Sequence, residues 1–256
     1  MTVRDRLREG LYRVLSLTGG KRQGVRAILL YHSVGNTTTQ SVPLPKFEQQ
    51  MEWLQEHFQV VRLCDLPKTV ATEAPGINIA CLTFDDGYQD NFEMALPILE
   101  SLGLKATFFI ATGFLGGEFP SFAGKVAMML PEQIYRLAQL GHEVGAHTVN
   151  HSRLTKVPFN EARTEIEDSK HLLEKLLGHE IVSFAYPKGD CDEATRSLVA
   201  ANGFQLAVTT REGLTGDDPD WLMLPRVSIS HKFSLKLFEA KLSHATTLRE
   251  RFRIRR

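Results

Sequence analysis

Two pairs of residues in this 256-residue chain have the types and spacing for chemistry at a metal ion. Asp85 and Asp86 are adjacent, and adjacent carboxylates repel one another unless a cation lies between them. His147 and His151 are four positions apart, a spacing that lets both imidazoles reach one metal ion from a helical turn. One aspartate with two histidines leaves coordination positions open for water and substrate, which indicates a catalytic metal.

Each pair also has a structural interpretation. One aspartate of an isolated Asp-Asp pair can cap the following helix, and surface helices contain His pairs by chance. The positions favour chemistry, because Asp85 follows the apolar run 77–84 and His147 follows the apolar run 142–146. The carboxyl ends of buried strands are where α/β proteins gather their functional residues.

Short apolar runs alternate with amphipathic segments from residue 26 onward, and continuous apolar runs are typical of strands buried on both faces. We predict strands over 26–32, 58–63, 77–84, 105–110, 142–146, 181–186, 205–209 and 224–229. We predict helices over 45–57, 90–102, 131–140, 160–177, 192–202 and 233–243. The alternation predicts an α/β fold, a distorted (β/α) barrel of about seven strands, with a doubly wound open sheet as the alternative. The glycine-rich stretch 113–130 is expected to form a loop over the site.

Three motifs resemble, in order and spacing, those of the polysaccharide deacetylase family, also called the NodB-homology or carbohydrate esterase family 4 domain. They read TFDDGY at 83–88, HTVNH at 147–151 and FAYPKG at 184–189. Weaker matches at 30–34, 106–109 and 141–145 surround them, so the resemblance covers about residues 27–230. It implies a TIM-like barrel of about seven strands whose divalent metal hydrolyses N-acetyl groups of amino sugars.

The resemblance also implies roles for single residues. Asp85 takes the position of the general base, while Asp86, His147 and His151 take those of the metal ligands. The metal is expected to be zinc, with cobalt, nickel, manganese or iron as alternatives. A Lewis-acidic metal polarises the amide carbonyl and lowers the pKa of a bound water from near 16 toward about 7.

The third motif matches the loop in which the family binds the oxyanion of the reaction. The candidate residues are Tyr186, Pro187 and Lys188, whose backbone would provide the donor. Pro187 has no N–H to give, so the donor must come from a neighbour. Trp221, in the aspartate-rich stretch 217–221, loosely resembles the family's late Asp-Trp motif and is expected to wall the acetyl pocket.

The chain departs from the family pattern in two places. Well-known members carry an arginine just before the motif-three proline, but residues 180–186 contain none. Arg226, on the last predicted strand, is the expected substitute and would pair with Asp85, unless it is a surface arginine at a strand edge. The general acid also departs from the family pattern. His231 stands in the expected late position but lacks the leucine-rich run that precedes this histidine in the family, and His32, at the end of the first predicted strand, is the other candidate.

A metal-dependent hydrolase that removes N-acetyl groups from a polysaccharide or a lipid-linked saccharide fits these features best. One alternative is a deformylase or other deacylase of a lipid-linked sugar. A second is an Fe(II) enzyme of oxygen chemistry, because two histidines and a carboxylate also hold iron. A third is a relative that binds carbohydrate or metal without turnover, which the missing motif-three arginine keeps open.

Charge is unevenly distributed along a chain whose formal net charge is zero. Residues 1–26 hold seven cations and two anions, and residues 241–256 hold six cations and one anion, so the segment between them is acidic. We predict a basic amphipathic helix over 1–25, a catalytic domain over 26–243 and a basic tail over 244–256. The arginine-rich first segment could lie on an anionic membrane, each cation contributing up to roughly 1 kcal/mol, or dock on the barrel.

The remaining composition excludes several classes of protein. Apolar residues make up 43% and charged residues 23%, values of a globular rather than a disordered chain. The three cysteines are far apart and form no CxxC pair, which predicts reduced thiols. No signal peptide or transmembrane span is apparent, and nothing suggests a nucleic-acid partner. We therefore expect a cytoplasmic protein, with the inner membrane as its peripheral contact, and leave the oligomeric state open.

Overall fold

The computed structural model describes residues 23–243 apart from 36, 39–40 and 122–123, together with residue 246. Nearly all of the predicted N-terminal helix and of the predicted basic tail lies outside the described residues. The strands are β1 Arg26–Tyr31, β2 Gln59–Val61, β3 Ile79–Phe84, β4 Thr107–Ile110, β5 Glu118–Ser121, β6 Gly124–Ala127, β7 Glu143–Ala146, β8 Ser183–Ala185, β9 Leu206–Glu212 and β10 Leu224–Ser228. The α-helices are α2 Leu44–His57, α3 Leu66–Thr72, α4 Leu96–Ser101, α5 Pro131–Gln139, α6 Phe159–Leu177, α7 Glu193–Ala201 and α8 Leu235–Lys241.

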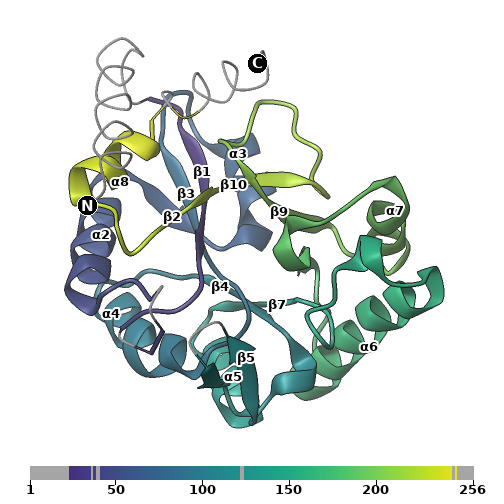
Figure 1. Ribbon diagram of the computed structural model, residues 1–256. Helices are drawn as coiled ribbons and strands as arrows, with labels where there is room; N and C mark the ends of the chain where they lie inside the picture. The colour runs from purple at the N-terminus through teal and green to yellow at the C-terminus, as the bar shows by residue number, and fades with distance from the viewer. Residues whose placement is uncertain (1–22, 36, 39–40, 122–123, 244–245, 247–256) are drawn as a thin grey trace.

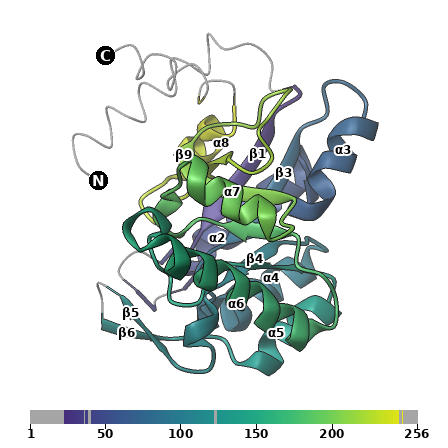
Figure 2. The same cartoon turned by 90° about the vertical axis from the view of Figure 1, so that its right-hand side faces the viewer.

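Seven parallel strands close into a barrel in the order β1, β10, β9, β8, β7, β4, β3. The ring closes because β3 pairs back with β1 along its whole length, from Arg26 opposite Ile79 to Tyr31 opposite Phe84. The other edge of β3 is shared, with β2 along its first half and β4 along its second half. Helices surround the ring in both views (Figures 1 and 2). The predicted (β/α) barrel of about seven strands is confirmed.

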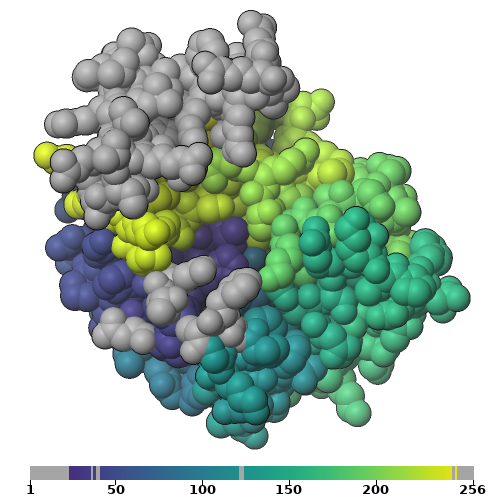
Figure 3. All heavy atoms as spheres, viewed as in Figure 1, coloured from purple at the N-terminus to yellow at the C-terminus, as the bar shows by residue number. Residues whose placement is uncertain are grey.

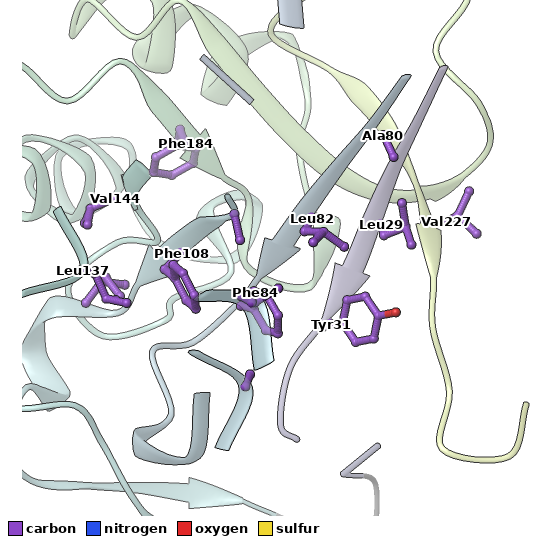
Figure 4. Packing of buried hydrophobic residues seen from close by; sticks show 14 of the residues in the cluster. Leu29, Tyr31, Ala80, Leu82, Phe84, Phe108, Leu137, Val144, Phe184 and Val227 are labelled. Carbon is purple, nitrogen blue, oxygen red and sulfur yellow. The ribbon is translucent and has the colours of Figure 1, made fainter. Parts of the chain in front are cut away.

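Alternation along the strands divides the core into an outer and an inner layer. On β3, Leu82 and Phe84 belong to the outer layer between barrel and helices, whereas Ile79 and Cys81 belong to the inner one. The outer layer is seen in Figure 4, where Phe84 stacks on Phe108 with ring centroids 4.9 Å apart. Because successive side chains of a strand point to opposite faces, the inner row of β3 continues into Asp85 at the carboxyl end of the barrel.

The stretch 113–130 differs from the expected loop. Its centre is the antiparallel hairpin of β5 and β6, in which Phe119 pairs with Val126. An apolar cluster holds the hairpin against the barrel mouth: Tyr88, Phe119, Val126 and Met128 are buried together, with Phe114 packed on them. The helix predicted over 90–102 also differs, because it begins as a π-helical turn at Asn91–Ala95 before α4.

Two further expectations concern the whole chain. Cys64, Cys81 and Cys191 are free thiols in the structure. Within the part of the chain that the structure describes, no helix is long and apolar enough to cross a membrane.

Candidate active site

A buried ion pair joins two strands across the mouth of the barrel. Arg226 on β10 donates from Nη1 to Asp85 Oδ1 at 2.7 Å and from Nη2 to Asp85 Oδ2 at 2.6 Å. The guanidinium is held from behind, since its Nε donates to the Thr209 carbonyl at 2.8 Å and Nη1 also donates to Thr83 Oγ1 at 3.0 Å. Arg226 is thus a buried partner of Asp85 and not an arginine at a strand edge.

A second carboxylate faces two imidazoles. Asp86 Oδ1 lies 3.4 Å from His147 Nε2 and 3.4 Å from His151 Nε2. This oxygen is buried and has no hydrogen-bond partner among the described residues, a costly state that a bound cation would relieve. His147 Nδ1 donates to the Ala185 carbonyl at 2.7 Å, which leaves the lone pair of Nε2 free for a metal. The residues therefore fit a divalent metal, with all three ligand atoms within 4.8 Å of one another.

The two histidines do not meet on a helical turn, which corrects the geometry expected from their spacing. They lie in an irregular loop after β7, where Thr148 has a φ of 64° and His151 a φ of 54°. Left-handed backbone is uncommon for residues with a side chain and is held in place by its surroundings. The loop reverses direction so that both rings face Asp86, with their centroids 4.9 Å apart.

Helix α6 supplies the main support of this histidine loop. Glu165 is buried, and its Oε2 accepts from the backbone N–H of Val149 at 2.9 Å and of Asn150 at 2.8 Å. Its Oε1 accepts from Asn150 Nδ2 at 2.7 Å. Sequence reasoning missed Glu165. In the sequence, Glu165 could have been noticed only as an acidic residue on the apolar face of a predicted helix.

The charges in the site reinforce one another. Burial alone would raise the pKa of Asp85, but Arg226 outweighs it and holds the pKa below its ordinary value. Asp86 is also held below its ordinary pKa, because the neighbouring histidines outweigh burial. Burial lowers the pKa of His151 to about 4, and the charges of His147 and Lys188 act in the same direction. Ionised carboxylates and a neutral imidazole are the states that a metal requires.

His147 behaves differently from its neighbour. Burial lowers its pKa, but the two aspartates outweigh burial and raise it above the ordinary value. A divalent cation bound between the same groups would compete with a proton for His147 Nε2, because metal and proton need the same lone pair.

A cavity of about 760 Å³ opens above these residues. Figure 3 shows this face of the molecule hollowed where purple N-terminal, teal central and yellow-green C-terminal segments meet. Asp85, Asp86, His147 and His151 line its floor together with neighbouring loops. The cavity also brings in three of the other residues singled out from the sequence, namely His32, His231 and Lys188.

Three predicted pocket residues, Tyr186, Pro187 and Trp221, do not line this cavity. Tyr186 belongs to the outer core, because it continues the row of Phe184, and its hydroxyl donates to the Leu222 carbonyl at 3.1 Å. Trp221 packs instead against the inner core near the opposite end of β9, where its carbonyl accepts from the N–H of Ala207. The expectation that Trp221 walls the acetyl pocket was wrong.

The hairpin contributes an aromatic side chain that the sequence did not indicate. Phe119 packs edge-on against the ring of His151, with centroids 5.4 Å apart, and Phe114 packs against Phe119 at 4.8 Å. Both phenylalanines line the cavity beside Pro120. The stretch 113–130 therefore does cover the site, as a hairpin.

A closed barrel of seven parallel strands, with an arginine-paired aspartate and a candidate Asp-His-His metal site at the carboxyl ends of those strands, has the architecture of the NodB-homology class. Residues 72–207 match the family described as polysaccharide deacetylase. The chain belongs to this family.

Relatives of known sequence or structure agree with this assignment. The proposed polysaccharide deacetylase YxkH of Bacillus subtilis is 30% identical over 215 residues, which cover 83% of this chain and 74% of that protein. The poly-β-1,6-N-acetyl-D-glucosamine N-deacetylase of Staphylococcus epidermidis is 23% identical over 200 residues, 75% of this chain and 68% of that one. The structure of the Streptococcus pyogenes deacetylase PplD in complex with acetate aligns with a TM-score of 0.76 and 27% identity, over 86% of this chain and 99% of that one.

Proposed function

We propose that this protein is a metal-dependent N-deacetylase of amino sugars in a polysaccharide or a lipid-linked saccharide. The observation that carries the proposal is the unpartnered Asp86 Oδ1 between the Nε2 atoms of His147 and His151, next to an ionised Asp85. Family membership supports the reaction, and the nitrogen-rich ligand set favours zinc among divalent metals. A metal bound there polarises the amide carbonyl and makes water a stronger acid.

Asp85 is the proposed general base. Each carboxylate oxygen accepts one hydrogen bond from Arg226 and keeps a lone pair for an attacking water. Arg226 keeps the carboxylate ionised and fixes its orientation, both of which a base needs before the reaction begins. Water adds to the carbonyl carbon as Asp85 removes its proton, and the C–N bond then breaks to give acetate and the free amine.

Lys188 supplies the proposed oxyanion donor. Its backbone has a left-handed φ of 61°, and its N–H has no hydrogen-bond partner among the described residues. The turn that follows is fixed, because the Gly189 N–H donates to the Tyr186 carbonyl at 2.8 Å. A donor that is oriented in advance stabilises charge as it develops on the carbonyl oxygen.

His32 is the proposed general acid in preference to His231. Both line the cavity, but His32 lies close enough to both aspartates to lower the pKa of Asp85 and of Asp86. His231 lies at the rim, where its carbonyl accepts from Lys46 Nζ at 2.8 Å. A proton donor near the base and the metal ligands is well placed to protonate the departing amine.

The arginine of the site distinguishes this proposal from a non-catalytic binding protein. A protein that only binds its ligand was an alternative because no arginine precedes Pro187. Arg226, on another strand, provides the guanidinium that binds Asp85. An Fe(II) oxygenase has no use for the Asp85–Arg226 pair, which suits proton transfer in hydrolysis. A deformylase uses the same residues, so the acyl group must be identified by experiment.

Product release from acylated sugars tests the function. Acetate and formate are measured with N-acetylated and N-formylated oligosaccharides, and with polyprenyl-linked sugars, before and after treatment with a chelator. We expect acetate release that stops with the chelator and returns with zinc, and that is lost in Asp85→Asn while the metal content is kept. Release of neither acid by any metal-loaded sample would leave the binding protein as the better explanation.

A further inference from the structure

The cavity over the candidate metal site has two chemically different walls. One wall is aromatic and comes from the hairpin, the turn after Asp86 and the turn after β4: Tyr88, Phe114, Phe119 and Pro120. The other wall comes from the loops that follow β1, β8 and β10, which are close together around the ring: His32, Lys188, His231 and Lys232. This second wall, the basic wall, carries two lysines and two histidines and no carboxylate.

The carboxylates of the cavity cannot neutralise these lysines. Asp85 and Asp86 are the only acidic residues among the described residues that line it. Asp85 already binds the guanidinium of Arg226 through both oxygens, and Asp86 faces the two histidines. No ion pair joins Lys188 or Lys232 to an acidic group within the described part of the chain. Both lysines therefore line the cavity without an acidic partner among the described residues.

The position of the basic wall relative to the reaction centre is also defined. Lys188 is exposed and lines the cavity from the loop after β8, and its charge helps to lower the pKa of His151. The loop bearing Lys232 is tied to helix α2, because Lys46 Nζ donates to the His231 carbonyl at 2.8 Å. An uncompensated positive wall in a concave site attracts anions and raises their local concentration.

We propose that the substrate is an anionic saccharide, in which a phosphate or carboxylate group next to the N-acyl sugar binds the basic wall through Lys188 and Lys232. This inference rests on the proposed function and specifies its substrate class. In this arrangement the sugar ring lies against the aromatic wall, which Tyr88, Phe114 and Phe119 line, while the anionic group lies on the basic wall. A neutral polymer uses only the aromatic wall.

Paired substrates test the proposal. The metal-loaded enzyme is given an N-acetylated oligosaccharide, the same oligosaccharide with a terminal phosphate, that phosphate esterified to a polyprenyl chain in detergent, and an analogue with a carboxylate. The first two establish whether the anion matters, and the last two distinguish a lipid-linked source from an acidic polymer. We expect kcat/KM to be about fivefold higher for the phosphorylated sugar than for the neutral one, with the advantage lost as the salt rises to about 0.5 M.

A charge reversal at the wall makes the test specific. Lys232→Glu should reduce the preference for the anionic substrate about tenfold, mainly through KM. Lys236→Glu is the matched control, because Lys236 is exposed on α8 and does not line the cavity. This variant should prefer the anionic substrate over the neutral one as strongly as the native enzyme does. A preference unchanged by both variants, or equal rates on neutral and anionic sugars, overturns the proposal and leaves deacetylation intact.

The anion site can also be tested if the protein does not deacylate any sugar. If no substrate yields acetate or formate, binding of the phosphorylated oligosaccharide is measured directly by calorimetry. Weaker binding to Lys232→Glu than to Lys236→Glu supports the anion site even without turnover. Equal binding to the two variants overturns it.

Discussion

Arg226 and Asp85 are 141 positions apart in the chain, yet they form a two-bond ion pair in which both side chains are almost completely buried. The pair links the two strands on either side of β1, because β10 and β3 are both neighbours of β1 in the ring. An ion pair in such a place is costly to break, because the remaining charge has no water to replace its partner.

Removing the arginine should therefore affect both stability and rate. We expect Arg226→Ala to lower the free energy of unfolding by about 3–5 kcal/mol and to reduce turnover strongly at an unchanged metal content. The acid limb of the pH–rate profile should move to higher pH, because Arg226 holds the pKa of Asp85 down. Denaturant titration, metal analysis and the pH dependence of kcat/KM check these outcomes.

An exposed arginine provides the matched control for that variant. Arg196 also forms a two-bond pair, with Asp220, but at the surface. Arg196→Ala should leave both the free energy of unfolding and turnover nearly unchanged, because water replaces the lost partner of an exposed charge. Native turnover in Arg226→Ala would contradict its role beside Asp85.

Glu165 is expected to control metal affinity without touching the metal. Glu165→Gln loses the acceptor for Asn150 Nδ2 and the charge that holds two backbone N–H groups, so the histidine loop should loosen. We expect metal affinity to fall about tenfold, measured by competition with a chromophoric chelator. Glu167→Gln, on the same helix and paired with Arg163 at the surface, should bind metal like the native protein. Equal affinity in both variants would rule out this support.

The two candidate acids should differ in their pH–rate profiles. A general acid must be protonated to act, so the variant that lacks it should lose the alkaline limb and about 10²-fold or more in kcat. We expect this for His32→Ala, while His231→Ala keeps the limb and changes KM. The opposite pattern would transfer the role to His231.

His142 should make the protein less stable in mild acid. Its Nδ1 accepts from the Ala106 N–H at 3.1 Å and its Nε2 lies 3.0 Å from Glu100 Oε1, so the neutral ring is fully bonded. Burial lowers its pKa from 6.5 to about 4, and between these values the unfolded chain binds the proton more tightly. Stability should fall by about 2 kcal/mol from pH 7 to pH 5 because of this group.

A variant without the imidazole isolates that contribution. In His142→Asn the unfolding free energy, measured by denaturant titration at each pH, should lose this part of its slope. A slope equal to that of the native protein would show that His142 does not titrate in this way.

The basic segment before the barrel should attract an anionic membrane. Residues 1–26 hold seven cations against two anions. We expect the full chain to sediment with vesicles containing anionic lipid, less so at high salt, and a chain lacking residues 1–22 to bind less. Vesicles of neutral lipid are the control. If neither chain bound the vesicles, these arginines would have no role in membrane binding.

The amino-acid sequence by itself determined the strands and, through motifs that resemble a known family, the candidate metal ligands. From the alternation of strands and helices alone, an open sheet stayed possible beside the barrel. Every predicted strand is present, because long apolar runs and their spacing are local properties that survive into the fold. Asp85, Asp86, His147 and His151 could be singled out because they follow apolar runs and the strand ends of an α/β protein meet on one face, and the family resemblance then implied their roles.

The tertiary structure alone decided which groups support those ligands. Helix α6 brought Glu165 to the histidine loop, and the hairpin brought Phe119 to His151. The pairing of Arg226 with Asp85 was predicted from the sequence, but only the closed ring showed that it is buried and that Thr83 and Thr209 also bind the guanidinium. The tertiary structure also turned Tyr186 and Trp221 away from the cavity. Such contacts depend on register, strand parity and left-handed backbone, which are fixed by packing between distant segments, and no local pattern of residues encodes them.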